Sequence, residues 1–295
     1  MRGLYEKYER YVSPLALISG FIFDYLTLKR VDFLFDNLLI VLYLFFVGVS
    51  IIIINLFETD RPRNKFIESI YEFLPLFIQF SFGGLFSAFI IFYSKSASLF
   101  TSGAFILILG ILLVGNEFFR KNYSKLAFQI GIYFVALFSF SIYFLPVLIK
   151  QMGVLVFLWS GAISLILISL FISVVARLAP KKHKESGKPS SLVVLSLYVS
   201  INILYFTNVI PPIPLSLKAG DVFHAVERQT DGNYLVAGES SNVWKEKFSL
   251  SQKIHLISGE PVYVFSSIFA STNLSVGLIH HWQYFDENGG EWVSS

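Results

Sequence analysis

Long apolar runs, separated by short polar breaks, fill the first 210 residues of the chain. A helix that crosses a bilayer needs roughly 20 mainly apolar residues, within a range of about 17–25. Seven segments satisfy this length, so the pattern predicts an α-helical polytopic membrane bundle of about seven transmembrane helices. The expected spans are 12–28, 37–57, 73–93, 99–114, 126–149, 154–178 and 191–210.

The polar breaks predict how these helices are connected. Charged or proline-containing loops are expected at 58–63, 116–122 and 180–189, and the last of these holds four lysines. The breaks at 94–96 and 150–153 are so short that they predict tight turns between antiparallel helices. Seven helices joined in this way place the two ends of the bundle segment on opposite sides of a membrane.

After residue 210 the apolar pattern changes to short alternating runs. Prolines at positions 211, 212 and 214 end the last helix. We expect residues 211–295 to form a small β-rich, sandwich-like domain, separate from the helical domain 1–210. Because the chain stops on a newly started hairpin strand, this domain is expected to be truncated. The expected strands are 222–227, 233–237, 261–270, 274–285 and 291–294, with a hairpin turn at 286–290.

The composition supports the membrane interpretation. The chain has 295 residues, of which 55% are hydrophobic and 15% charged, whereas a soluble domain carries about 25% charged residues. The 32 phenylalanines and 15 tyrosines suit helix packing and membrane interfaces. The lipid bilayer is therefore an expected partner. The sequence contains no cysteine, which excludes disulfides and thiolate metal sites.

The distribution of charge predicts the orientation of the chain. Residues 1–210 hold 18 basic and 11 acidic side chains, and residues 211–295 hold 5 and 9. Of the basic residues in the helical domain, 14 fall on the side of the N-terminus and 4 on the other side. Basic loops stay in the cytoplasm, so we expect a cytoplasmic N-terminus and an extracytoplasmic β-rich domain. The basic charge is interpreted as a topology signal, and no nucleic-acid partner is expected.

Three stretches of the sequence carry a family resemblance: "VIPPIPLSLKAGDVFHAVER", "GEPVYVFSSIFASTNLSVGLIHHWQYFD" and "GGEWVSS". They resemble the bacterial membrane proteins called domain of unknown function 2914, and "SGFIFDYLTLKRVD" resembles the opening of the polytopic members. The family pattern continues past the end of this chain. The resemblance implies a multi-pass protein of the bacterial inner or plasma membrane, and it implies no activity.

Asp24 is the acid that falls near the middle of an expected span. A carboxylate there costs about 2.5–3.5 kcal/mol on insertion scales, so such residues are often proton or cation relays. The alternative is a residue near the membrane surface, paired with Lys29 or Arg30 one turn away. If segment 12–28 lies flat on the membrane, six spans remain and the orientation of the β-rich domain is unchanged.

Other polar and small residues in the expected spans have structural explanations. Close helix packing accounts for Gly83 and Gly84, together with Ser81 and Ser87 on the same span. Interhelical hydrogen bonds are expected from Gln79, Gln129 and Asn202.

In the β-rich domain, His280, Trp282 and Trp244 are the candidate ligand or interaction residues. Period-two alternation places His280 and Trp282 on the apolar face of their strand. Core packing is therefore the favoured interpretation for both, with His280 hydrogen-bonded. Trp244 lies among charged residues and is expected to be exposed. His280 and His281 point in opposite directions, and no spacing typical of a metal site is present, so neither a metal nor a cofactor is expected.

No nucleophile elbow, phosphate loop, zinc-protease helix or dinucleotide fingerprint occurs in the sequence. We therefore expect an uncharacterised integral membrane protein that is not an enzyme. It would present its extracytoplasmic β-rich domain to an envelope component or a partner protein. The alternative is a small-solute or ion transporter that uses Asp24, although no internal repeat is evident. An enzyme acting on lipid-linked substrates is disfavoured because the external loops are short and poor in acids, histidines and arginines.

Overall fold

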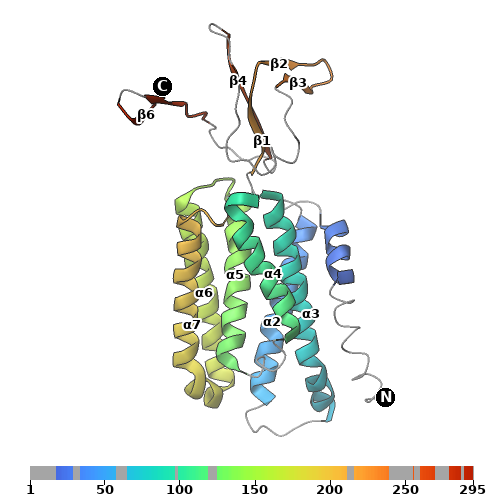
Figure 1. The fold of residues 1–295 in the computed structure, drawn as a ribbon. Coiled ribbons are helices and arrows are strands. Elements are labelled where there is room, and N and C mark those ends of the chain that lie inside the picture. The colour runs from blue at the N-terminus through green and yellow to red at the C-terminus, as the bar shows by residue number, and fades with distance from the viewer. Residues whose placement is uncertain are drawn as a thin grey trace.

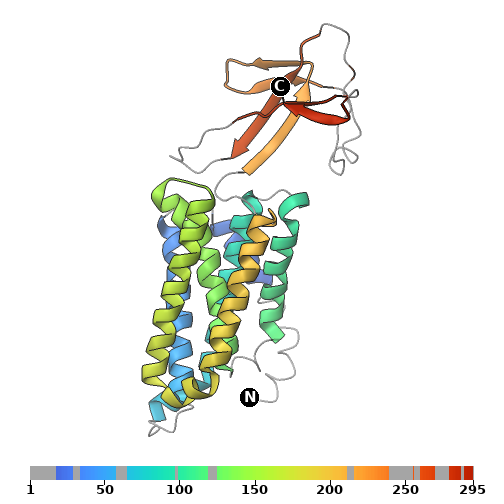
Figure 2. The same cartoon turned by 90° about the vertical axis from the view of Figure 1, so that its left-hand side faces the viewer.

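The computed structural model contains a helical bundle with strands beyond one end (Figures 1 and 2). A first helical segment covers residues 18–27. Six further helices follow: α2 (Leu34–Phe57), α3 (Lys65–Ser96), α4 (Leu99–Phe118), α5 (Leu126–Ile149), α6 (Val154–Leu178) and α7 (Pro180–Phe206). The structure describes residues 18–28, 34–57, 65–96, 99–118, 125–210, 216–238, 255, 260–269, 279–286 and 289–294.

Seven helical segments in the described residues agree with the number expected from hydropathy. The expected spans 126–149 and 154–178 coincide with α5 and α6. Helices α2, α3 and α4 extend beyond the expected ranges, and α3 begins eight residues before position 73. Helix α7 begins eleven residues before position 191 and ends at Phe206, four residues before the expected end. Of the expected span 12–28, the first six residues lie outside the described part of the chain.

Helix α5 is the centre of the bundle. It packs against α2, α3, α6 and α7, and 16 of its 24 residues are buried. A helix that is apolar on nearly all sides belongs in the interior of a bundle, and α5 has this composition. Helix α4 differs, because its main helical neighbour in the described structure is α3.

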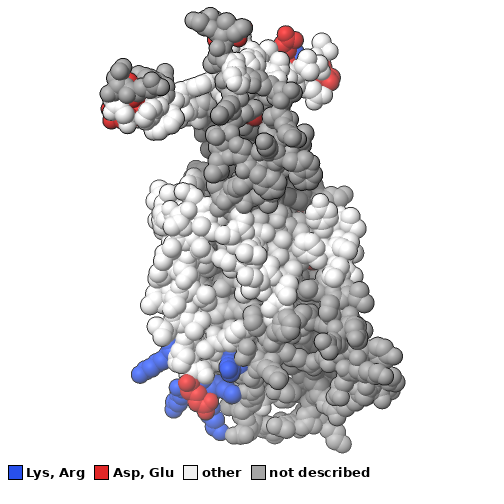
Figure 3. All heavy atoms as spheres, in the orientation of Figure 1, with Lys and Arg blue, Asp and Glu red and all other residues white. Residues whose placement is uncertain are grey.

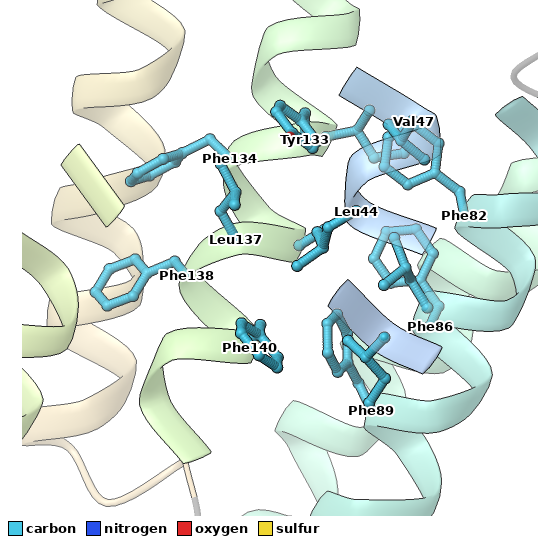
Figure 4. Packing of buried hydrophobic residues seen from close by; sticks show 14 of the residues in the cluster. Leu44, Val47, Phe82, Phe86, Phe89, Tyr133, Phe134, Leu137, Phe138 and Phe140 are labelled. Atoms are coloured by element: carbon cyan, nitrogen blue, oxygen red, sulfur yellow. The ribbon is translucent and has the colours of Figure 1, made fainter. Parts of the chain in front are cut away.

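Aromatic side chains fill the core between α2, α3 and α5 (Figure 4). Phe82, Phe86 and Phe89 line one face of α3 and are fully buried. On the other side of α5, the ring of Phe138 stacks on Phe157 of α6 at 5.7 Å and on Tyr198 of α7 at 5.8 Å. Stacked and edge-to-face pairs of this kind contribute beyond simple burial, so the abundance of phenylalanine is explained by the interior of the bundle.

The outward faces of the helices are apolar as well. Leu155 and Trp159 on α6 and Leu192 on α7 are all largely exposed. Figure 3 shows a broad band of uncharged atoms around the described part of the bundle, with lysines and arginines gathered at the end away from the strands. A water-soluble bundle would place polar residues on this surface. By length and composition, five helices among the described residues are able to cross a membrane: Phe35–Phe57, Phe77–Ser94, Leu126–Ile149, Val154–Leu178 and Pro180–Phe206. A shorter apolar helix spans Gly103–Asn116.

The expected loop at 180–189 is helical, so this prediction was wrong. Helix α6 ends at Leu178, and α7 begins two residues later with Pro180 in its first turn. Proline is well accommodated there because the first amide groups of a helix have no intrahelical partner. Pro189 lies inside α7. The lysine-rich segment therefore forms the first turns of α7 and turns the chain back with a single residue, Ala179, between the helices.

The tight turn expected at 150–153 is present. Lys150 adopts a left-handed conformation with φ of 55° directly after α5. Gly153, directly before α6, has φ of 129°, a region that is open almost only to glycine. The two residues reverse the chain within four positions, and α5 and α6 consequently pack antiparallel.

The strands form three antiparallel pairs among the described residues. The long strands β1 (Ser216–Phe223) and β4 (Tyr263–Phe269) pair across a distance of about forty residues in sequence, with a register shift between Leu217 and Ala219. The other two pairs are the hairpin β2 (Ala225–Arg228) with β3 (Tyr234–Ala237), and the hairpin β5 (Gln283–Asp286) with β6 (Glu291–Ser294).

In the described structure the three strand pairs are separate two-stranded sheets, and a face-to-face sandwich stays a prediction. The expected strand 222–227 is divided at His224 between β1 and β2. Of the expected strand 274–285, residues 279–282 are not in a strand and β5 begins at Gln283, while residues 274–278 lie outside the described residues. The strands expected at 233–237 and 291–294 agree with β3 and β6.

Candidate functional site

One group of buried polar side chains lies in the half of the bundle nearest the strands, around Asp24. Tyr43 lies nine residues after the start of α2, and Ser87 lies nine residues before the end of α3. At 1.5 Å per residue, each is about 14 Å inside its helix end. The helical segment 18–27 brings Asp24 to the same level. Three elements that are distant in sequence thus contribute polar side chains to one place.

Asp24 is 9% exposed, and its carboxylate faces the hydroxyl of Ser87 on α3. It also acts electrostatically on the phenol of Tyr43 on α2. Ser87 is 3% exposed, and its Oγ atom makes no hydrogen bond of regular geometry, either with Asp24 or with its own helix. The sequence identified Asp24 but assigned Ser87 to helix packing. Lys29 and Arg30, the partners considered from sequence, lie outside the described residues.

The ring of Tyr43 is held by its contact with α3. A Cβ atom added at Gly84 would lie 2.7 Å from Cε2 of Tyr43 and 3.2 Å from its hydroxyl oxygen. Only a residue without a side chain leaves room for the phenol between the two helices. Gly84 therefore places the tyrosine hydroxyl one helical turn from Ser87, and its packing role agrees with the sequence expectation.

A second acid, Asp36, is buried near the start of α2. The sequence pattern placed it just before the span that begins at 37, whereas α2 begins at Leu34. Its carboxylate acts electrostatically on the hydroxyl of Tyr143 on α5, which has no hydrogen-bond partner. Nearby, Tyr93 on α3 donates a hydrogen bond to the carbonyl oxygen of Ser139 at 2.9 Å. Asp24 is therefore not the only buried acid of the bundle.

Other buried amides connect helices rather than line a site. Asn55 on α2 donates to Oε1 of Gln129 on α5 at 2.6 Å, and Asn116 on α4 donates to the carbonyl oxygen of Gln79 on α3 at 2.7 Å. Such bonds join neighbouring helices in an apolar medium, as expected for the side chain of Gln129, whereas Gln79 takes part through its main-chain carbonyl. Asn202 instead donates to the carbonyl oxygen of Tyr198 on its own helix at 2.8 Å. The expectation of an interhelical bond was wrong for this residue.

The candidate residues of the strand-rich region lie on its surface. His280 is exposed, and its Nε2 atom forms a hydrogen bond with Oγ of Ser266 on β4 at 2.9 Å. His281 bonds instead to Ser294 on β6 at 3.0 Å, so the two rings contact different strands. Trp282 is 46% exposed. The core position expected for His280 and Trp282 is therefore wrong, because β5 pairs with β6 alone and no second layer covers them in the described structure.

Two aromatic side chains of the hairpin β5–β6 are also exposed. Trp292 on β6 is 66% exposed and contacts the ring of Phe285 on β5 with centroids 5.5 Å apart. Trp244 lies outside the described residues. An open cavity of about 380 Å³ in the strand-rich region is lined by His224, His255, Glu260 and Pro261. Within the described residues, no group of three or more histidines and acids is arranged to hold a metal ion.

Comparison with known proteins finds no matching family model, no similar curated protein and no similar solved structure. The resemblance to the domain of unknown function 2914 therefore stays a prediction from the residues quoted above. Two sites carry the functional argument: the buried Asp24 group of the bundle and the exposed aromatic surface of β5 and β6.

Proposed function

We propose that the chain is a multi-pass integral membrane protein whose strand-rich region binds an envelope component or partner protein outside the cytoplasm. The five long apolar helices support the membrane location. The apolar outer surface of the bundle supports it as well, because those side chains contact lipid without cost but expose a large apolar area to water.

The orientation follows from the positions of the basic residues. Arg177, Lys181, Lys182, Lys184 and Lys188 lie where α6 and α7 meet, at the end of the bundle away from the strands. Basic residues next to a span remain in the cytoplasm. The strands then lie outside, and the plasma membrane of a bacterium is the location that the family resemblance implies.

The absence of cysteine makes this orientation directly testable. A single cysteine in place of Thr230, in the exposed turn between β2 and β3, would be the reporter of the strand-rich side. A cysteine in place of Lys184 on α7 would be its counterpart. A membrane-impermeant maleimide should label Thr230→Cys in intact cells and Lys184→Cys only after permeabilisation. Equal labelling of both in intact cells, or the reverse pattern, would reject the orientation.

The exposed aromatic surface is the observation that carries the binding role. Phe285 and Trp292, which contact each other on β5 and β6, are 49% and 66% exposed, and Trp282 just before β5 is 46% exposed. Tryptophans with flanking hydrogen-bonding groups supply much of the affinity at protein interfaces and sugar-binding surfaces. His280 and His281, each held by a serine on a neighbouring strand, would fix the orientation of a ligand.

Photo-cross-linking in intact cells tests this role. A photoreactive amino acid in place of Trp292 should give a discrete product with a protein or a wall polymer. The same amino acid in place of Thr230, also exposed but in the polar turn between β2 and β3, is the matched control and should give none. If position 292 yields only lipid adducts or no product, the binding role is wrong.

A second candidate function is ion-coupled transport, favoured by the burial of Asp24 inside the bundle. An acid at this depth is an expected feature of a coupling site. Flux of a solute into proteoliposomes that is abolished by Asp24→Asn would support transport. Flux that persists unchanged in that variant would reject Asp24 as the coupling residue.

Two finer points complete the proposal. Membership in the family of domain of unknown function 2914 is supported by the quoted stretches, one of which includes β4 and another β6. A sandwich-like arrangement of the strand-rich region would require the three strand pairs to stack face to face, and it is supported by the alternation in the sequence. Neither proposal involves a reaction, since the sequence contains no catalytic motif.

A further inference from the structure

We propose that Asp24, Ser87 and Tyr43 form a proton-binding site inside the helical bundle, at which the Asp24 carboxylate takes up and releases one proton. This site would supply the coupling step of the transport function proposed above. The proposal of the site does not depend on transport, because protonation of Asp24 can be measured without any solute.

The first argument is the convergence of three separate elements. Asp24 comes from the segment 18–27, Tyr43 from α2 and Ser87 from α3. Tyr43 and Ser87 each lie about 14 Å inside an end of their helix, and Asp24 is buried beside Ser87. A carboxylate at this depth is costly unless it is paired or neutralised.

The second argument is the unused hydrogen-bonding capacity of Ser87. Four other buried serines of the bundle donate to the carbonyl oxygen one turn back in their own helix: Ser141, Ser160, Ser164 and Ser190. Ser87 makes no such bond, although it is just as deeply buried. A buried hydroxyl without a partner calls for an explanation. Ser81, two turns earlier, is also unbonded, but Ser87 is the one that faces the Asp24 carboxylate.

The third argument is that the neighbours of Asp24 suit both of its protonation states. An ionised carboxylate only accepts hydrogen bonds, and the Ser87 hydroxyl that faces it is able to donate. A protonated carboxyl group donates one bond, which Oγ of Ser87 can accept. A rotation of the Ser87 hydroxyl therefore accommodates the proton without a change in the helices, while Tyr43 acts on Asp24 electrostatically. In the chemical step, a proton from water binds a carboxylate oxygen and no other bond is broken.

Among the described residues, two groups on neighbouring helices act on or contact Asp24. Tyr43 is the titratable group that faces Asp24 from α2, and α3 contributes the neutral Ser87. On its own segment, the neighbouring Tyr25 is 65% exposed and lies on the outer face. The proton is therefore assigned to Asp24 itself.

Infrared difference spectroscopy on the full-length protein in lipid tests the site. The pH is changed over the range in which the protein stays folded, and the carbonyl stretch of a protonated carboxylic acid is recorded. A pH-dependent band should appear in the wild type and be lost in Asp24→Asn. It should be retained in Asp36→Asn, the matched control for a second buried acid, and it should be retained at a shifted frequency in Asp24→Glu.

Substitution of the residues around Asp24 provides a second test, because a change in the band frequency would not result from a purely structural role of these residues. Ser87→Ala and Tyr43→Phe should each shift the frequency of the band, because the carbonyl stretch depends on the hydrogen bonds made to the carboxyl group. Ser141→Ala, in which the serine bonds only its own helix, should leave the frequency unchanged. The proposal is overturned if no band depends on Asp24, or if the band is lost in Asp36→Asn and kept in Asp24→Asn. If the band depends on Asp24 but solute flux persists unchanged in Asp24→Asn, coupling through Asp24 is rejected and the proton site stands.

Discussion

At the scale of single residues, Gly84 determines how closely α2 and α3 approach. Replacing it with alanine should lower the stability of the bundle by about 1–3 kcal/mol, the usual cost of overpacking a filled core. The reason is that the new Cβ atom would lie 2.7 Å from the ring of Tyr43. Thermal unfolding in detergent would measure the loss.

Gly110 on α4 is the matched control for that substitution. A Cβ atom there meets nothing within 4 Å. Gly110→Ala should therefore stay within about 0.5 kcal/mol of the wild type. Equal destabilisation by both substitutions would contradict the assigned packing role of Gly84.

Asp231 gives a prediction about pH. Its carboxylate accepts hydrogen bonds from the backbone N–H of Asn233 at 3.0 Å and from the side-chain amide of Asn233 at 2.7 Å. These bonds, the backbone bond first, hold the pKa of Asp231 below its ordinary value. The stabilisation of the turn is therefore present above the unfolded pKa of about 3.9 and is lost as the pH falls through the lower, folded pKa.

An NMR titration of the Asp231 carboxyl carbon would measure this shift. Asn233→Ala removes the side-chain donor and keeps the backbone donor, so it should return the pKa only part of the way to its ordinary value. Thr230→Ala, in the same turn, should leave the titration unchanged. An ordinary pKa in the wild-type protein would refute the described turn geometry.

The sequence identified the acid of the bundle site but not its partners. Asp24 stands out because it interrupts an apolar run. Ser87 does not stand out, because a serine in a span is equally suited to packing, and its contact with Asp24 depends on how two distant helices meet. His280 and Trp282 were assigned to a core by alternation alone, which indicates which side chains share a face but not whether anything covers that face.

At the scale of elements, the turn between α5 and α6 depends on Gly153. Its φ of 129° lies in a region where side chains are strained by about 1–3 kcal/mol. Gly153→Ala should destabilise the protein by that amount, as measured by thermal unfolding. Gln151→Ala, at an exposed position of the same turn, should have little effect. Similar losses in both variants would indicate that the turn as a whole is sensitive and that the backbone angle of Gly153 is not the cause.

The helices were more predictable than the strands for a physical reason. Hydropathy reports a local property, and each apolar run of about 20 residues forms its helix without reference to the others. The hydropathy prediction was wrong at 180–189, because lysines and two prolines are typical of loops. In the structure, Pro180 occupies the first turn of α7, and the lysine side chains point away from the bundle core. The pairing of β1 with β4 joins segments about forty residues apart, and no local pattern specifies it.

At the scale of the whole molecule, the proposed orientation depends on the basic residues at the start of α7. Replacing Lys181, Lys182, Lys184 and Lys188 with glutamine should weaken that orientation, because positive charge next to a span is what retains it in the cytoplasm. Labelling of Thr230→Cys in intact cells should fall clearly below that of the parent protein.

The control for this experiment replaces the same four lysines with arginine. Charge is preserved, so labelling should equal that of the parent protein. A glutamine variant that is labelled as fully as the arginine variant would show that other segments determine the orientation.

The central position of α5 also affects how the protein can be made. Its faces contact helices that are synthesised both before and after it, and Phe138 finds its stacking partners on α6 and α7. When α5 enters the membrane during synthesis, α2 and α3 are already present to pack against one of its faces. The other face remains exposed to lipid until α6 and α7 follow. Completion of the bundle must then wait for the final helix, so a chain interrupted before α7 would offer quality-control proteases an unfinished surface.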